Sequence, residues 1–413
     1  MMKQKHILFL HQFFRHPGEP GGTRAYWVSK ELISRGYKVT IITQRNSYYK
    51  EFHNVKPLER VNIDGIDVLY IKNGYSNEMS FSRRIISFLM FMFKSTWYSL
   101  KEKGISLVIA SSTPISIGFP ALVFSKFKRV PLLFEVRDLW PDIPIEMGVI
   151  RNGLLKRIFK LFEKTIYRNS IHVVALSPGM ADGIARYIDR SKITMIPNVA
   201  KIDKFWPREK KLELLEKLNL SFDSFKIIHF GAMGLVNGLD YFVDAARICN
   251  STNNRDIDFI LVGPGSQKAR YIKIQEEEKI ENLYIFDRMP MSEISEFVNA
   301  CDVSYMGVSH LYPILKHNSA NKFFDSLSAG KPILMNFSGW LEDIVIRNQC
   351  GYSSDPHNPE DLVARINDLK NNPELLDTMG RNSRKVAESM YDKSILCPQF
   401  VSLVDQLLAE NKN

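Results

Sequence analysis

Short apolar runs alternate with longer helical patterns along almost the whole chain, and this alternation constrains the fold more than any other feature. Strands that alternate with helices form parallel sheets covered by helices, because each crossover needs a helix to return to the same edge. In the first half of the chain the pattern predicts helices over 23–35, 83–102 and 154–168. It predicts strands at 7–11, 38–43, 68–71, 107–110, 132–135, 173–176 and 194–196.

A second series of the same kind follows a polar stretch at 200–208, which we interpret as a linker between domains. It predicts strands at 226–230, 258–262, 283–286, 302–305 and 332–335, and helices over 238–250, 267–278, 292–300 and 321–329. At 413 residues the chain is long enough for two ordinary domains. We therefore predict an α/β fold with two Rossmann-like, doubly wound domains at 1–200 and 201–385. A C-terminal helix at 386–413 could cross back to the first domain.

Composition narrows the possible partners and cofactors. The formal net charge of +10 favours an anionic partner, which could be a nucleotide phosphate, a nucleic acid or an acidic membrane face. The four cysteines form no Cys-x-x-Cys pair, and no zinc-binding spacing is present, so we expect neither a metal nor another cofactor. The N-terminus leads directly into a strand, and no apolar run reaches about 18 residues, so we expect a cytoplasmic protein without a spanning helix.

The common nucleotide-binding and hydrolase signatures are missing from the sequence. After the first expected strand, residues 17–24 read PGEPGGTR and not Gly-x-Gly-x-x-Gly, which argues against a dinucleotide-dependent dehydrogenase. The chain also has neither a P-loop nor a Gly-x-Ser-x-Gly elbow.

The loop at Gly21 and Gly22 lies between the first expected strand and the first expected helix. Two glycines let backbone N–H groups approach a ligand, and a helix N-terminus favours negative charge. Parallel sheets bind ligands at this carboxyl edge. Arg24 could add a contact to a donor phosphate. The alternative is an ordinary turn with Arg24 in solvent.

The segment 318–332 reads as a helix N-terminus, a helix, a glycine stop and a strand. Ser319 or Asn321 could cap the helix. Lys322 and Asp325 share a helix face, where the lysine could meet a diphosphate and the carboxylate could accept both hydroxyls of a ribose. The alternative is a capped surface helix that carries a local Lys–Asp pair.

Taken in order, these segments resemble glycosyltransferase family 4, which has the GT-B fold. The forms GGTR at 21–24 and VRDLWP at 136–141 resemble its WbuB-like branch, which includes amino-sugar transferases of bacterial surface-polysaccharide assembly. The resemblance covers nearly the whole chain. Its remaining pieces are IPN at 196–198, FGAMG at 230–234, VGPG at 262–265, and Lys322 and Asp325 followed by AGKP at 329–332.

The resemblance implies roles for residues of both domains. Gly21 and Gly22 would lie near the donor phosphate and the reacting sugar, and Asp138 would contact the transferred sugar or the acceptor. On this basis the candidate catalytic residues are Gly22, Asp138 and Lys322.

In the second domain, the resemblance implies that Gly231 and Met233 line the diphosphate cleft through backbone groups. Lys322 would contact the diphosphate, with Asn321 beside it, and Asp325 would bind the ribose.

The sequence departs from the family pattern at three places. His317 replaces a common Glu eight residues before Asp325, which is itself Asp in place of Glu. Ala232 and Asn237 replace the Arg and Lys of the family's diphosphate cradle. Lys322, Arg24 and Arg288 would then have to supply the positive charge.

The resemblance implies a retaining transfer from a UDP-sugar, of an N-acetylated amino sugar, to a lipid-linked glycan acceptor in O-antigen or capsule synthesis. Two segments fit a membrane location, because 83–98 is rich in Phe and Met between basic ends and 154–164 is a basic amphipathic pattern. We expect a peripheral enzyme on the anionic inner face of the bacterial cell membrane. The alternative is that both helices pack their apolar faces on the sheet.

Two other functions remain open at this point. A UDP-sugar 2-epimerase also has two Rossmann halves but needs no acceptor. A nucleic-acid-binding protein would fit the charge, but the basic residues form no aromatic-interleaved strip, so we expect no nucleic-acid partner.

Overall fold

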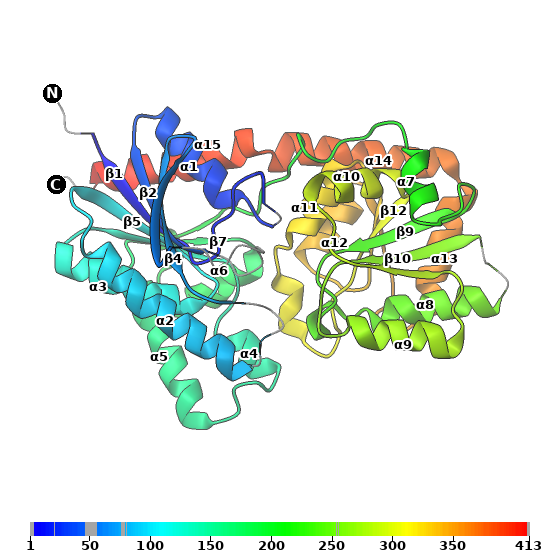
Figure 1. Cartoon of the computed structure of the whole chain (residues 1–413), viewed down its shortest axis with the longest axis horizontal. Helices are drawn as coiled ribbons and strands as arrows, with labels where there is room; N and C mark the ends of the chain where they lie inside the picture. Colours follow the sequence, from blue (N-terminus) through cyan, green and yellow to red (C-terminus); the bar gives the residue numbers. More distant parts are fainter. Residues whose placement is uncertain are drawn as a thin grey trace. The chain divides into compact units, whose positions relative to one another are not determined.

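The computed structural model describes residues 4–19, 21–45, 56–75, 79, 81–252, 254 and 256–410. The chain divides into two compact units, of which one comprises residues 1–197 with 396–413 and the other residues 198–395 (Figure 1). Each unit holds one sheet flanked by helices, so the predicted α/β fold with two Rossmann-like units is confirmed.

The first unit contains an eight-stranded sheet, in which only β3 runs antiparallel to its neighbour. Its order is β3 (Leu58–Ile63), β4 (Ile66–Lys72), β2 (Lys38–Arg45), β1 (His6–Leu10), β5 (Ile105–Ser111), β6 (Leu132–Val136), β7 (His172–Ala175) and β8 (Ile193–Met195). All seven predicted strands are present. The sequence pattern missed β3, an edge strand joined to β4 by a turn in which Asp64 and Gly65 both have positive φ.

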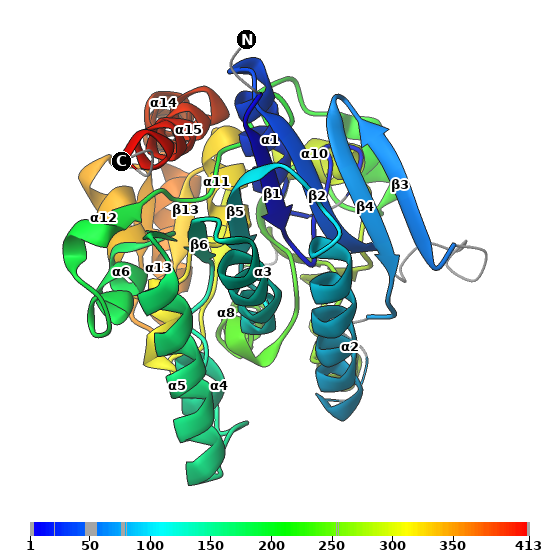
Figure 2. The same ribbon diagram turned by 90° about the vertical axis from the view of Figure 1, so that its left-hand side faces the viewer.

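Helices cover both faces of this sheet. The predicted helices are present as α1 (Arg24–Ser34), α2 (Phe81–Ser99) and α5 (Gly153–Asn169). Three further helices were not predicted: α3 (Gly118–Lys128), α4 (Asp142–Glu146) and α6 (Pro178–Ala185). Helices α2, α3 and α5 lie side by side on one face, and α1 lies on the other (Figure 2).

The second unit contains a six-stranded, fully parallel sheet. Its order is β11 (Leu283–Phe286), β10 (Ile257–Val262), β9 (Phe225–Phe230), β12 (Val303–Met306), β13 (Ile333–Met335) and β14 (Gly351–Ser353). The helices around it are α7 (Leu212–Lys217), α8 (Asp240–Ser251), α9 (Lys268–Glu278), α10 (Met291–Ala300), α11 (Asn321–Ser328), α12 (Trp340–Arg347), α13 (Pro359–Asn371) and α14 (Pro373–Val386).

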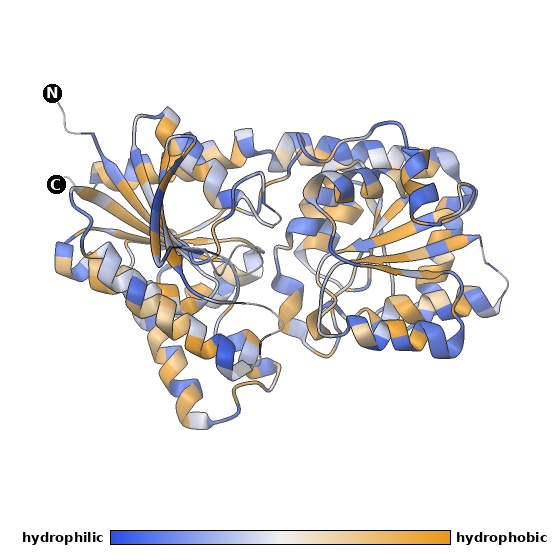
Figure 3. Ribbon diagram, in the orientation of Figure 1, coloured by the Kyte–Doolittle hydropathy of each residue, from blue (hydrophilic) through white to orange (hydrophobic). Residues whose placement is uncertain are grey.

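The four inner strands of the second sheet, β10, β9, β12 and β13, are buried on both faces, as is usual for a parallel sheet. Neighbouring residues of β9 show this, because Ile227 belongs to the hydrophobic cluster on one face and Ile228 to the cluster on the other. The inner strands of both sheets are accordingly hydrophobic along most of their length (Figure 3).

The last helix, α15 (Lys393–Glu410), starts in the second unit and packs in the first unit from Leu396 onward. There Asp405 accepts a hydrogen bond of 2.9 Å from Arg35 and another from the Tyr37 hydroxyl. The segment that returns is therefore 396–410, whereas we expected it to begin at residue 386.

The earlier boundary also differs from the expected one, since the second unit begins at Asn198 and not at residue 201. The side chains of this stretch explain the shift. Asn198 bonds to Ser319, and Lys201 pairs with Asp325, both within the second unit. The polar stretch that we read as a linker therefore starts inside the second unit.

Candidate functional site

Two loops meet at the carboxyl edge of the second sheet, where Gly231 follows β9 and Gly263 follows β10. The φ angles of Gly231 and Gly263, 147° and 143°, lie in a region that favours glycine. A Cβ added to Gly263 would stand 1.9 Å from the Gly231 carbonyl oxygen, so the two loops pack backbone against backbone. The packed backbones of these two loops form the surface over which the Lys322 side chain lies.

The Lys322 side chain extends from the first turn of α11 over this surface. Its Nζ lies 3.4 Å from His229 Nε2, and its Cδ lies 3.6 Å from the Cβ position of Gly231. The Asn237 amide satisfies both of its neighbours when its oxygen accepts from Lys322 Nζ at 3.1 Å and its nitrogen donates to the Ala232 carbonyl at 2.8 Å. These two partners of the Lys322 ammonium, His229 and Asn237, are neutral side chains.

The electrostatics of this lysine are unusual. Burial lowers the pKa of Lys322 to about 7. Burial, together with the nearby Lys322 charge, also holds the pKa of His229 well below its usual value, so the imidazole is neutral. Within the described part of the chain, no carboxylate lies within 4 Å of the Lys322 ammonium. The site thus holds a cation whose charge an anionic ligand would stabilise.

The N-terminus of α11 has no side-chain cap. The N-cap is Ala320, and neither Ser319 nor Asn321 caps the helix, which corrects our expectation for those two residues. Ser319 is engaged by Asn198 instead. The first N–H groups of α11 therefore keep their capacity to bind an anion beside Lys322.

Asp325 does not pair with Lys322, so the alternative of a local Lys–Asp pair on a surface helix is wrong. Six of the eight residues of α11 are buried. Asp325 Oδ2 accepts a 3.0 Å hydrogen bond from Lys201, and both side chains are buried. Burial raises the pKa of Asp325, while Lys201 acts in the opposite direction. Its Oδ1 has no hydrogen-bond partner among the described residues.

Two expected backbone donors are already used in the loop packing. The amide of Gly231 donates to the Val262 carbonyl at 2.9 Å, and that of Met233 donates to the Pro264 carbonyl at 2.8 Å. The Met233 side chain is fully buried in the core. Neither amide can also donate to a diphosphate, which corrects the role we expected for them. Because Gly231 has no side chain, the Lys322 side chain can lie directly over its backbone.

Arg288 is exposed and follows β11, the edge strand. Strand β10 separates β11 from β9, so Arg288 starts about 10 Å from Gly231 along the sheet edge. The structure does not bring it to Lys322, and a contact with the donor stays a prediction.

In the first unit, Arg24 is an internal structural residue. It is buried, and its Nε pairs with Glu135 at 2.7 Å while its other nitrogens donate to the carbonyls of Ile196 and Pro197. Burial alone would raise the pKa of Glu135, but Arg24 and Arg137 hold it below its usual value. Arg24 thus ties the start of α1 to β6, and its guanidinium is not available to a donor phosphate as we had expected.

The Arg24–Glu135 pair brings the glycine loop to the carboxyl edge of this sheet. Gly21 has a φ of 125°, which favours glycine. Gly22 leads into α1, whose N-cap Thr23 makes no side-chain capping bond. The Thr23 hydroxyl is buried without a partner among the described residues. This helix end too keeps free N–H groups.

Asp138 lies at the same edge, after β6, next to two residues that sequence reasoning missed. Its carboxylate accepts a hydrogen bond from Thr113, and burial raises its pKa. Arg137 Nη1 lies 3.4 Å from Nε2 of His11, which follows β1. Burial, reinforced by Arg137, lowers the pKa of His11 to about 3, so this imidazole is neutral. Their positions directly after buried strands were the available signal.

Two helices of the first unit expose rows of large apolar side chains. On α2 these are Ile86, Leu89, Met90, Phe93 and Trp97, and on α5 they are Leu154, Leu155, Ile158 and Leu161. Phe93 and Trp97 are 61% and 63% exposed. The helical spacing places each set on one side of its helix. The alternative that these faces pack on the sheet is therefore wrong. In the described part of the chain, no helix is long and apolar enough to cross a membrane.

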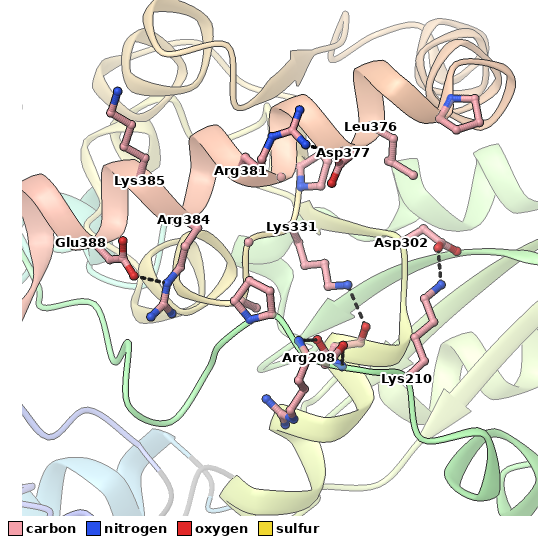
Figure 4. A pocket seen from close by; sticks show the side chains of 17 residues that line it. Arg208, Lys210, Asp302, Lys331, Leu376, Asp377, Arg381, Arg384, Lys385 and Glu388 are labelled. Atoms are coloured by element: carbon pink, nitrogen blue, oxygen red, sulfur yellow. Dashed lines mark hydrogen bonds and ion pairs between the residues drawn. The ribbon is translucent and has the colours of Figure 1, made fainter.

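A cavity of about 500 Å³ opens at the opposite, amino edge of the second sheet (Figure 4). Three of its basic residues are held by internal partners: Lys331 by the carbonyls of Asn299 and Cys301, Lys210 by Asp302 and Arg384 by Glu388. Burial lowers the pKa of Lys331 to about 8. The cavity lies away from Lys322, and its compensated charges give it no evident part in the chemistry. Among the described residues, no cluster of three His, Cys, Asp or Glu could hold a metal.

Comparison with known proteins settles the family. A model of the glycosyl transferase 4-like domain matches residues 21–199, and a model of glycosyl transferases group 1 matches residues 210–386. The chain is a glycosyltransferase of the GT-B fold. These two matches correspond closely to the two units of this glycosyltransferase.

Individual relatives agree with this assignment. The enzyme is 24% identical to the probable glycosyltransferase WbjE of Pseudomonas aeruginosa, over 79% of this chain and 80% of the relative. It is 21% identical to the putative colanic acid biosynthesis glycosyl transferase WcaI of Escherichia coli, over 68% and 69% of the two chains. Its fold matches Anabaena Alr3699/HepE in complex with UDP and glucose with a TM-score of 0.71, at 16% identity over 98% and 100% of the chains. The epimerase alternative is not favoured.

Proposed function

We propose that this glycosyltransferase moves an N-acetylated amino sugar from a UDP-sugar to a lipid-linked glycan, with retention of the anomeric configuration. The acceptor would belong to a bacterial surface polysaccharide such as O-antigen or capsule. The family places the enzyme among sugar transferases, and the name of WcaI refers to the synthesis of such a polysaccharide.

The observation that carries the proposal is the Lys322 ammonium beside the uncapped N-terminus of α11. A nucleoside diphosphate brings the negative charge that this arrangement lacks. Asp325 Oδ1, buried without a described partner on the same helix, would accept a ribose hydroxyl. The solved structure of HepE contains UDP and glucose, which supports uridine as the base.

The chemical step follows from where charge develops. As the sugar–phosphate bond breaks, negative charge accumulates on the departing diphosphate, and Lys322 with the α11 N–H groups would stabilise it. Gly22 and the uncapped start of α1 would approach the reacting sugar, and Asp138 would contact the sugar or the acceptor. The acceptor hydroxyl oxygen would form the new bond to the anomeric carbon on the side from which the diphosphate leaves, and its proton would pass to the departing phosphate oxygen.

We further propose that the exposed faces of α2 and α5 dock the first unit on the anionic inner face of the cell membrane. The apolar rows would enter the interface, while flanking cations such as Lys156 and Arg157 on α5 would meet acidic lipids. A lipid-linked acceptor would be reached at this surface.

The test is a donor screen followed by product analysis. Titration calorimetry with UDP-, GDP- and dTDP-sugars should give tight binding only for the UDP-sugars, and NMR of the product should show the anomeric configuration of the donor. Lys322→Met should lower kcat/KM by at least about 10-fold, because a charge-assisted contact contributes about 1.5–3 kcal/mol. Lys273→Met, on the exposed side of α9, is the matched control.

Two outcomes would reject the proposal. Normal kcat/KM in Lys322→Met would remove this lysine from the donor site. Conversion of a UDP-sugar to its epimer in the absence of any acceptor would indicate an epimerase.

A further inference from the structure

A cavity of about 340 Å³ lies in the first unit between the end of β4 and one side of α2. Its described lining combines cations with apolar and small polar side chains: Lys72, Asn73, Gly74, Met79, Arg83, Ile86, Ser87, Met90 and Lys94.

The charge of this lining is one-sided. Arg83 and Lys94 carry two positive charges, and no acidic side chain is among the nine described lining residues. Lys94 Nζ donates to the Lys72 carbonyl at 3.0 Å, which holds the ammonium over the end of β4. Two cations on a concave surface without a described carboxylate favour a multiply charged anion such as a diphosphate.

The lining is also continuous with the apolar face of α2. Ile86 and Met90 line the cavity, and both are also among the exposed residues of that face, with Phe93 and Trp97 further along the helix. A ligand that fills the cavity would therefore have an anionic group next to a long apolar chain.

The position in the sheet relates the cavity to the chemistry. Lys72 ends β4, and Asn73 and Gly74 follow it at the carboxyl edge, the edge that also carries His11 and Asp138. Strand β2 separates β4 from β1, so the cavity lies about 10 Å from the end of β1. A short glycan attached to a group in the cavity could reach the reacting centre along this edge.

We propose that this cavity binds the diphosphate of the lipid-linked acceptor, with the lipid chain lying along the apolar face of α2. The inference rests on the proposed function, since it assigns a binding site to the acceptor of that reaction. It adds Arg83 and Lys94 as the residues that hold the acceptor's charged group.

Farnesyl diphosphate is a suitable probe, because it joins a diphosphate to an apolar chain. It would be titrated into the full chain saturated with UDP, so that the donor site is occupied. Binding should be tighter than that of pyrophosphate or farnesol alone. The double variant Arg83→Ala/Lys94→Gln should weaken it at least about 10-fold. The control is Lys126→Ala/Lys128→Gln, which removes two cations from α3 outside the cavity.

A second variant keeps the test independent of those two cations. Met90→Glu places a negative charge in the wall and should also weaken the probe, with an unchanged melting temperature as evidence of folding. Equal binding of the probe to the wild type and both folded variants would overturn the inference. So would displacement of the probe by phosphatidylglycerol vesicles, which would identify a general phospholipid site. Failure of UDP itself to bind would instead reject the proposed function.

Discussion

Lys322 is the group whose protonation should change most when the donor binds. Without ligand its pKa is about 7, because it is buried. A diphosphate placed beside it would favour the charged form and raise the pKa. At pH 8 a group of pKa 7 is about 10% protonated, and it becomes almost fully protonated once its pKa exceeds about 9. Binding of UDP at pH 8 should therefore take up about 0.8 proton, and at pH 7 about half a proton.

Calorimetry can count these protons. UDP is titrated into the enzyme at pH 7 and pH 8 in buffers of different ionisation enthalpy, and the slope of the observed enthalpy against that quantity gives the proton number. His229 should not contribute, because its pKa lies well below this range. Lys322→Met should abolish the uptake at both pH values, and Lys273→Met should leave it unchanged.

The reasoning fails if Lys322→Met and the wild type take up the same number of protons at pH 8. It also fails if the wild type takes up fewer protons at pH 8 than at pH 7, because a pKa near 7 in the free enzyme requires the opposite order.

Three further predictions test other parts of the molecule. Lys201→Met leaves the Asp325 carboxyl buried without its cation, so UDP should bind about 10-fold more weakly and lose its advantage over 2′-deoxy-UDP, whereas Lys201→Arg should retain both. Burial raises the pKa of Glu163 to about 7, above its unfolded value, so the free energy of unfolding measured in urea should fall as pH rises from about 4.5 to 7 and then level off. Glu163→Gln should remove up to about 3 kcal/mol of this pH dependence, and the same pH profile in the variant and the wild type would contradict the prediction. Phe93→Ala/Trp97→Ala should weaken binding to phosphatidylglycerol vesicles about 30-fold, because about 2 kcal/mol of apolar burial is lost, whereas Leu212→Ala in the second unit should not weaken it. Equal sedimentation of the double variant and of Leu212→Ala with the vesicles would show that the apolar face of α2 does not dock on the membrane.

The sheets could be predicted because their strands are short and buried on both faces. The run at 225–230 is fully buried, and its apolar composition is visible without any partner. The strands that escaped prediction have weak local signals. In the edge strand β3, half-buried residues alternate with exposed ones, and β14, which reads Gly-Tyr-Ser, has no aliphatic residue. Long apolar helices were found, but helices such as α3 lack a clear periodic pattern next to Pro120.

Side-chain partners that are distant in sequence could not be predicted. The position of Lys322 at the start of α11 followed from local spacing, but the partner of Asp325 is 124 residues away in a stretch that reads as a linker. Arg24 was expected to point outward, because Glu135, 111 residues later, gives no local sign of a buried pair. The prediction that the Gly231 and Met233 amides bind the diphosphate was wrong for the same reason. Only the packing of the loops after β9 and β10 shows that the Met233 amide already donates to a carbonyl of the neighbouring loop.

The placement of Lys322 offers a physical reason for the loss of the family's usual cradle cations at Ala232 and Asn237. The Asn237 side chain lies 3.1 Å from the Lys322 ammonium. A second ammonium at that separation would repel the first by on the order of 5 kcal/mol at an effective dielectric constant of about 20. A lysine at 237 and a charged lysine at 322 are therefore alternatives. With Asn at 237, the amide oxygen accepts a hydrogen bond from Lys322 and orients the lysine over Gly231. One cation on helix α11 would then bind the diphosphate, in place of the two cations that the family pattern has at positions 232 and 237 of the loop.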